Sequence, residues 1–186
     1  SPLFFILSNT RGMDAAQAAR LTRDICVNLK QALEALKKQG GAINPIMVSR
    51  SDSTLRGHYP VETDVIAEEL GPFDAHFLVP AFFEGGRFTR DGTHYLMVDE
   101  LPVPVHETEF ARDSVFGFGT AYLPDYVAEK TEGRIAAQDL VGHLAERGGF
   151  EGRAERQRLV ERRAQRVDVR SRVHVQARHL RLLRAH

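Results

Sequence analysis

The feature that most limits how this chain folds is an apolar strand followed by a polar loop and a helix. Residues 45–48, Pro-Ile-Met-Val, predict a buried strand, and apolar spacing over residues 61–70 predicts a helix beginning just after Pro60. Residues 51–57 between them read Ser-Asp-Ser-Thr-Leu-Arg-Gly. This order of elements is typical of ligand sites in α/β proteins. The sequence therefore predicts a loop that holds a small polar ligand.

A second strand and loop follow the first pair. Residues 77–80, Phe-Leu-Val-Pro, predict another buried strand, and residues 81–89 predict the glycine-containing loop after it. The carboxyl ends of parallel strands meet at one edge of a sheet, so we expect the two loops to share a cleft. Arginine binds carboxylate or phosphate, and aspartate, serine and threonine bind hydroxyls, so the predicted ligand is a hydroxylated anion. The candidate binding residues are Asp52, Ser53, Thr54, Arg56, Gly57, Arg87 and Thr89.

A structural interpretation of the same residues stays open. Asp52 and Arg56 are spaced to form an internal salt bridge that stiffens the loop, and Ser53 or Thr54 is suited to capping the structure that follows. In the second loop, the glycines before Arg87 serve a turn equally well, with Arg87 exposed. Composition and spacing do not decide between ligand binding and this role.

Helical and hairpin patterns surround these loops. Asp14 and Gln17 form a capping-box pattern before an apolar repeat over residues 18–36, which predicts a long helix. Residues 94–98 and 102–105 predict a hairpin, with shorter helices from residue 123 and over residues 139–144. We therefore expect an α/β fold: a Rossmann-like, largely parallel sheet with flanking helices and an inserted β-hairpin, incomplete at its N-terminus.

Three motifs, in this order, resemble those of the four-carbon acid sugar kinases. They are residues 51–57, residues 80–89 (Pro-Ala-Phe-Phe-Glu-Gly-Gly-Arg-Phe-Thr) and residues 103–113 (Val-Pro-Val-His-Glu-Thr-Glu-Phe-Ala-Arg-Asp). The resemblance spans residues 4–149 and concerns the amino-terminal, sugar-binding domain. It implies ATP-dependent phosphorylation of D-threonate, D-erythronate or 3-oxo-tetronate. It also implies that the Asp-Ser-Thr-Leu-Arg-Gly positions line a sugar-acid pocket, which favours the ligand-binding interpretation.

Two parts of the family pattern are missing from the sequence. The family's early Asp-Asp-Leu-Thr-Gly loop is absent, and residues 2–7 already read as an interior strand, so we expect the chain to be truncated at its front. Nothing after Gly149 resembles the nucleotide domain, and no Gly-x-x-x-x-Gly-Lys-Ser/Thr loop occurs. ATP and Mg²⁺ are thus expected in the intact family enzyme, whereas this chain alone is expected to be inactive. The alternative is a non-catalytic sugar-acid-binding module or an inactive remnant.

Charge divides the chain near residue 150. Residues 1–150 contain 14 Lys plus Arg and 21 Asp plus Glu, a net charge of −7, whereas residues 151–186 contain 11 Arg and 4 acidic residues, a net charge of +7. We expect a partial sugar-acid-binding domain over 1–150 and an Arg-rich tail over 151–186. A shifted reading frame, or a disordered or loosely helical solvated segment, would explain this tail. Nucleic acid is not the expected partner, because no aromatic residue interleaves the arginines.

The remaining features point to an intracellular protein with a small-molecule partner. Cys26 is the only cysteine, and no apolar run reaches the roughly 20 residues that span a bilayer, so we expect a cytoplasmic location. The set of His94, His106, Glu107 and Glu109 matches no strong metal-site spacing, so no metal site is predicted. A missing front strand would expose a sheet edge and promote homo-oligomers.

Overall fold

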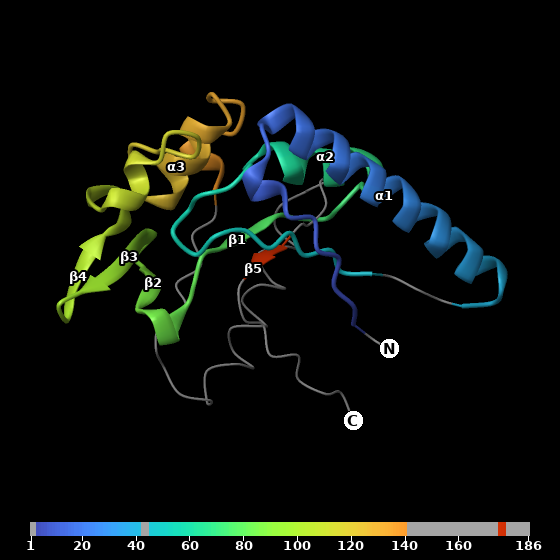
Figure 1. The fold of residues 1–186 in the computed structure, drawn as a ribbon, viewed down its shortest axis with the longest axis horizontal. Coiled ribbons are helices and arrows are strands. Elements are labelled where there is room, and N and C mark those ends of the chain that lie inside the picture. The colour runs from blue at the N-terminus through green and yellow to red at the C-terminus, as the bar shows by residue number, and fades with distance from the viewer. Residues whose placement is uncertain (1–2, 42–44, 141–174, 178–186) are drawn as a thin grey trace.

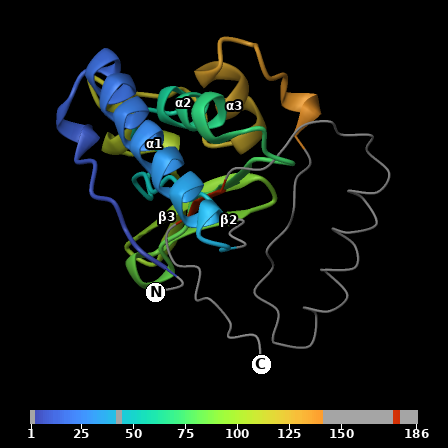
Figure 2. The same ribbon diagram turned by 90° about the vertical axis from the view of Figure 1, so that its right-hand side faces the viewer.

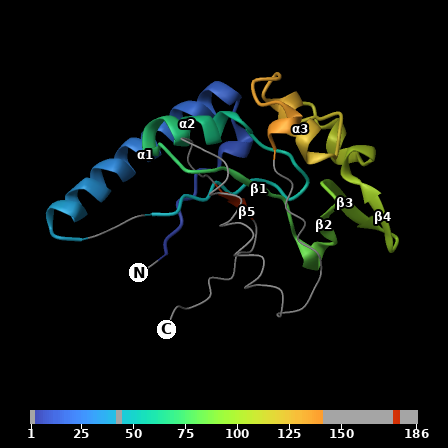
Figure 3. The ribbon, with the colours of Figure 1, turned by 180° about the vertical axis from the view of Figure 1, so that it is seen from behind.

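A computed structural model describes residues 3–41, 45–140 and 175–177. Figure 1 shows helices α1 and α2 side by side at one end and helix α3 beside strands β2 to β4 at the other, with β1 between the two groups; Figure 3 shows the same order from behind. The helices and strands are α1 (Ala15–Lys38), α2 (Val61–Leu70), β1 (Phe77–Val79), β2 (Arg87–Arg90), β3 (Thr93–Val98), β4 (Leu101–Pro104), α3 (Leu123–Lys130) and β5 (Val175–Ala177). Short 3-10 helices cover Thr10–Gly12, Phe83–Gly85, Val105–Glu107, Glu109–Arg112 and Ala137–Asp139.

Helix α1 begins at the predicted capping box. The Asp14 carboxylate accepts from the Gln17 backbone N–H at 2.7 Å, and the Gln17 side chain accepts from the Asp14 N–H at 3.1 Å. Buried Ala18, Thr22 and Cys26 form the covered side of the helix. α1 lies against α2, as Figure 2 shows from the side, and Arg23 of α1 pairs with Glu68 and Glu69 of α2. The predicted long helix and the helix after Pro60 are both confirmed.

Strands β2, β3 and β4 form an antiparallel sheet of two hairpins. Arg87 pairs with Leu96 and Arg90 with Thr93, while Tyr95 pairs with Pro104 and Val98 with Leu101. The first hairpin turns at Asp91 and Gly92, with φ of 50° and 77°, and the second at Asp99 and Glu100, with φ of 47° and 66°. Consecutive positive φ values match the twist of antiparallel strands.

The sheet corrects two predictions. The expected hairpin over 94–105 is present, but residues 87–89, which we predicted as loop, belong to β2, because the Asp91-Gly92 turn folds them back onto β3. The largely parallel, Rossmann-like sheet is not found among the described strands, where the parallel pairing is that of β1 with β5.

The strand predicted over 45–48 is not formed as a regular strand. Residues 45–47 lie outside any strand and Val48 makes an isolated bridge. Ile46 is 81% exposed and Val48 50% exposed, so the apolar side chains that motivated the prediction lack the cover that stabilises a buried strand.

Helix α3 confirms the helix predicted from residue 123. At the start of the helix predicted over 139–144, the structure has the 3-10 helix Ala137–Asp139. Residues 141–144 lie outside the described residues, as does most of the segment 151–186.

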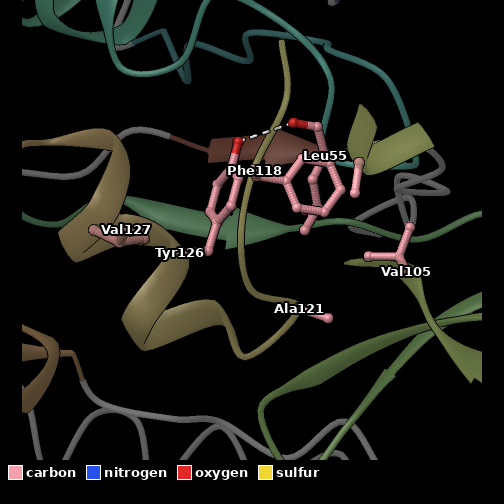
Figure 4. Packing of buried hydrophobic residues seen from close by; sticks show 7 residues of the cluster. Leu55, Val105, Phe118, Ala121, Tyr126 and Val127 are labelled. Carbon is pink, nitrogen blue, oxygen red and sulfur yellow. Dashed lines mark hydrogen bonds between the residues drawn. The ribbon is translucent and has the colours of Figure 1, made fainter. Parts of the chain in front are cut away.

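The apolar core joins the first polar loop to helix α3. Its buried members are Leu55, Val105, Ala111, Phe118, Ala121, Tyr126 and Val127. Figure 4 shows the Tyr126 hydroxyl directed at the Leu55 carbonyl, to which it donates at 2.9 Å. Tyr59 stacks on Tyr126 with 5.9 Å between ring centroids. The loop is therefore anchored to the core by a residue on a distant helix.

Removing the Tyr126 hydroxyl tests this anchor. We expect Tyr126→Phe to lower the free energy of unfolding by about 1–3 kcal/mol, because the buried Leu55 carbonyl loses its donor. Tyr122→Phe is the control, since Tyr122 is 43% exposed, and its effect should stay within about 0.5 kcal/mol. Urea unfolding followed by circular dichroism measures both. Equal effects of the two substitutions would contradict the anchor.

Candidate functional site

The loop of residues 51–57 is closed by its own hydrogen bonds. The Asp52 N–H donates to the Arg56 carbonyl at 3.3 Å, and the Ser51 hydroxyl donates to the same carbonyl at 2.9 Å. Leu55 has a φ of 66°, a conformation that turns the chain sharply. At Gly57, a Cβ atom would lie 2.0 Å from Ser51 Oγ, so glycine is required for the loop to close.

Asp52 is the centre of the loop's polar contacts. Its Oδ2 accepts from the Thr54 backbone N–H at 3.1 Å, from the Thr54 hydroxyl and from Arg56 Nε at 3.1 Å. Its Oδ1 lies 3.5 Å from Nη1 of Arg11, which precedes helix α1. Burial opposes ionisation of Asp52, but the donors from Thr54 and Arg56 outweigh it and hold the pKa of Asp52 below its ordinary value.

Arg56 links the loop to the third sequence motif. Its Nη1 lies 3.8 Å from Asp113 Oδ2, and its guanidinium lies over the Phe110 ring, 4.6 Å from the centroid. Arg56 also forms the internal salt bridge with Asp52, one of the two interpretations that the sequence did not decide between. The side chains of Arg56 and Asp52 keep exposures of 18% and 15%, and that of Arg11 keeps 54%. Both carboxylates and both arginines thus reach the surface at one place.

The two predicted loops meet through His94 of β3. His94 Nε2 lies 2.7 Å from the Ser53 carbonyl, and Nδ1 lies 3.0 Å from the Thr89 hydroxyl, which is also 3.2 Å from the Pro80 carbonyl. Burial lowers the pKa of His94, which keeps the ring neutral at neutral pH.

Besides Gly57, which closes the loop, and Thr89, which contacts His94, the predicted site residues fall into three groups. Asp52 and Arg56 carry the exposed charges, whereas Ser53 and Thr54 are buried, at 4% and 1% exposure, and support the loop from inside. Arg87 lies over the Phe82 ring, 5.6 Å from the centroid, and its buried Nε has no hydrogen-bond partner.

Sequence reasoning missed Arg11, His94 and Asp113 as members of the site. Asp113 lies in the third quoted motif, which was a usable signal, because a motif shared with the loop suggests a shared site. Arg11 and His94 reach the loop from distant parts of the chain, and no residue spacing in the sequence predicts these contacts.

No metal-binding cluster is present in the part of the chain that the structure describes: His, Cys, Asp and Glu side chains do not gather there in groups of three or more suited to a metal ion. Nor do the described helices include one that is long and apolar enough to cross a membrane.

The lowered pKa of Asp52 predicts how stability depends on pH. The folded state favours the ionised carboxylate, so this stabilisation is complete above the unfolded aspartate pKa of about 3.9 and is lost as pH falls through the lower folded pKa. The difference in free energy of unfolding between the wild type and Asp52→Asn should be constant above about pH 5 and shrink below about pH 4. Urea unfolding across that range measures it. A difference that does not change with pH would contradict the lowered pKa.

Comparisons with known proteins place this geometry in a family. The family model described as the sugar-binding N-terminal domain matches residues 1–183, which includes most of the Arg-rich segment. A D-erythronate kinase from Heliobacterium modesticaldum is 32% identical over 103 residues, covering 55% of this chain and 23% of that kinase.

Solved structures share the fold. A domain of unknown function from Bordetella bronchiseptica, solved with bound citrate as a domain-swapped dimer, is 25% identical with a TM-score of 0.56, covering 89% of this chain and 34% of that one. A putative tRNA synthase from Salmonella typhimurium LT2 is 23% identical with a TM-score of 0.53, covering 90% of this chain and 35% of that one. The chain thus spans 23% of the kinase and about a third of each solved structure. Because the family model matches nearly the whole chain, the resemblance found in the sequence is confirmed, and this chain belongs to the family of sugar-binding N-terminal domains.

Proposed function

We propose that this chain binds a four-carbon sugar acid (threonate, erythronate or 3-oxo-tetronate) and is the substrate-binding part of an ATP-dependent kinase. The observation that carries the proposal is the meeting of Arg11 and Arg56 at Asp52 on the surface. The family description and the relative named as a D-erythronate kinase support this ligand class.

The charges suit a ligand that has both a carboxylate and hydroxyl groups. A guanidinium binds a carboxylate through paired N–H groups, and an ionised aspartate accepts hydrogen bonds from hydroxyls. The contacts of Arg11 with Asp52, at 3.5 Å, and of Arg56 with Asp113, at 3.8 Å, are longer than a charge-assisted hydrogen bond. These long contacts can be exchanged for ligand contacts at less cost than short ones. In this proposal the arginines hold the sugar acid's carboxylate and Asp52 orients its hydroxyls.

The citrate bound by the Bordetella bronchiseptica domain adds support for the ligand class. Citrate carries carboxylates and a hydroxyl, as sugar acids do, and that domain shares this fold at 25% identity. We therefore propose a hydroxylated carboxylate as the general ligand and the four-carbon acids as its specific members.

Phosphoryl transfer also needs a nucleotide with Mg²⁺ and a positioned acceptor hydroxyl. The described residues do not fit the nucleotide and its metal ion, because their acidic side chains form no metal-binding group and the sequence holds no phosphate-binding Gly-x-x-x-x-Gly-Lys-Ser/Thr loop. We propose that this chain supplies only the acceptor side of the reaction, and that ATP and Mg²⁺ are held by other parts of the intact enzyme. No catalytic residue is assigned.

The first test is titration calorimetry with D-erythronate and D-threonate. We expect Arg56→Ala to weaken binding at least about tenfold, because a charge-assisted contact to the ligand is lost. Arg56→Lys should recover only part of the affinity, since an ammonium lacks the paired N–H groups.

Arg90→Ala is the matched control for this titration. Arg90 is exposed and also lies over an aromatic ring, that of Tyr95, at 5.4 Å, so its removal should leave affinity unchanged. Equal affinities of Arg56→Ala and Arg90→Ala would place the ligand elsewhere. Failure of the wild type to bind either acid would instead favour the inactive remnant.

A further inference from the structure

The side chain of His94 connects the candidate loop to the antiparallel sheet. His94 is fully buried, and its Nε2 lies 2.7 Å from the Ser53 carbonyl. A carbonyl oxygen only accepts hydrogen bonds, so Nε2 carries the proton, and in the neutral ring Nδ1 can only accept. The Thr89 hydroxyl lies 3.0 Å from Nδ1 and 3.2 Å from the Pro80 carbonyl, and its single proton is shared between these two acceptors. The Nε2–H group is therefore satisfied within the protein, by the Ser53 carbonyl.

The backbone of His94 is fixed independently of its ring. The His94 N–H donates to the Ala121 carbonyl at 2.9 Å, and Ala121 is a fully buried member of the core. The neighbouring Thr93 forms a bridge with Tyr122, the residue that precedes α3. The backbone position from which the imidazole extends is thus held by the core, separately from the ring's own hydrogen bonds.

Ser53, whose carbonyl binds this ring, lies directly between Asp52 and Thr54. Thr54 donates to the Asp52 carboxylate from both its backbone N–H and its hydroxyl. A displacement of the Ser53 carbonyl would therefore move the two groups that orient the carboxylate, and with it the place where Arg11 and Arg56 meet.

We propose that His94 is a positioning residue of the candidate site: its Nε2–H bond to the Ser53 carbonyl holds Asp52 where Arg11 and Arg56 reach it. Its effect on ligand affinity rests on the proposed function, whereas its effect on the loop backbone does not. The ring itself is buried and does not touch the ligand.

Two substitutions distinguish the roles of the two ring nitrogens. In His94→Gln the side-chain amide N–H₂ takes the place of Nε2–H and keeps a donor toward the Ser53 carbonyl. In His94→Asn the shorter amide lies nearer the place of Nδ1 and does not reach that carbonyl. Both variants lose the ring, but Asn is one methylene shorter than Gln and leaves a larger cavity at this buried position. His94→Met, which has the length of Gln without a donor, is therefore the packing control and should behave like His94→Asn.

The loop is measured first, without ligand, by ¹H–¹⁵N NMR of the whole chain. We expect the wild-type His94 ring to show the Nε2–H tautomer. The amide signals of Asp52, Ser53 and Thr54 should shift and exchange faster with solvent in His94→Asn, and stay close to wild type in His94→Gln. Loop signals that respond equally to both variants, or to neither, would overturn the positioning role, as would the opposite tautomer.

Calorimetry with D-erythronate and D-threonate then measures the consequence for the site. We expect His94→Asn to weaken binding roughly tenfold and His94→Gln to stay within about threefold of wild type. If the wild type binds neither acid, the proposed function fails, and the NMR result still decides the role of His94. If binding occurs and both variants match the wild type, the proposed coupling to the ligand is wrong.

Discussion

The candidate site depends on one constraint: the carbonyl groups of the loop 51–57 have no strand ladder to satisfy them. A buried carbonyl left without a donor destabilises the fold, so side chains must supply the missing bonds. His94 donates to the carbonyl of Ser53, Tyr126 to that of Leu55 and Ser51 to that of Arg56. Two of these donors come from β3 and α3, far along the chain. The shape of the loop is therefore a property of the assembled domain.

The same arrangement separates the buried residues that support the loop from the charged residues that reach the surface. Ser53, Thr54 and Leu55 are buried and hold the loop, whereas Asp52 and Arg56 project their charges to the partly exposed surface. Two further charges come from outside the loop: Arg11 lies near Asp52, and Asp113 lies near Arg56. Two positive and two negative charges therefore lie together at one place, and their charges balance. In the proposed function, some of these protein contacts are exchanged for contacts with a ligand that is both an anion and a hydroxyl donor.

The elements that could be predicted from the sequence are those that local residue patterns determine. Helix α1 follows from its capping box and apolar repeat, and the hairpin of β3 and β4 from its short extended pieces. Strand β2 was missed, because the glycines before Arg87 suggested a loop, while the Asp91-Gly92 turn that folds it onto β3 was the better signal.

Long-range pairing explains the remaining differences. The predicted strand over 45–48 required a partner that no local pattern supplies, and the largely parallel sheet depended on it. Within the site, the i to i+4 contact of Asp52 with Arg56 could be predicted, whereas the contact of Arg11 with Asp52 joins two segments that only the fold brings together.

The electrostatics of the anchors show why the loop can serve as a stable platform. Burial raises the pKa of Tyr126, and it raises that of the stacked Tyr59 to about 12, so these hydroxyls keep their protons at neutral pH. Burial lowers the pKa of His94, so its ring stays neutral there, while the lowered pKa of Asp52 keeps that carboxylate ionised. Each shift moves a group's titration away from neutral pH. The buried supports and the Asp52 carboxylate are therefore held in the protonation states that the loop geometry requires, and this arrangement persists across the neutral range.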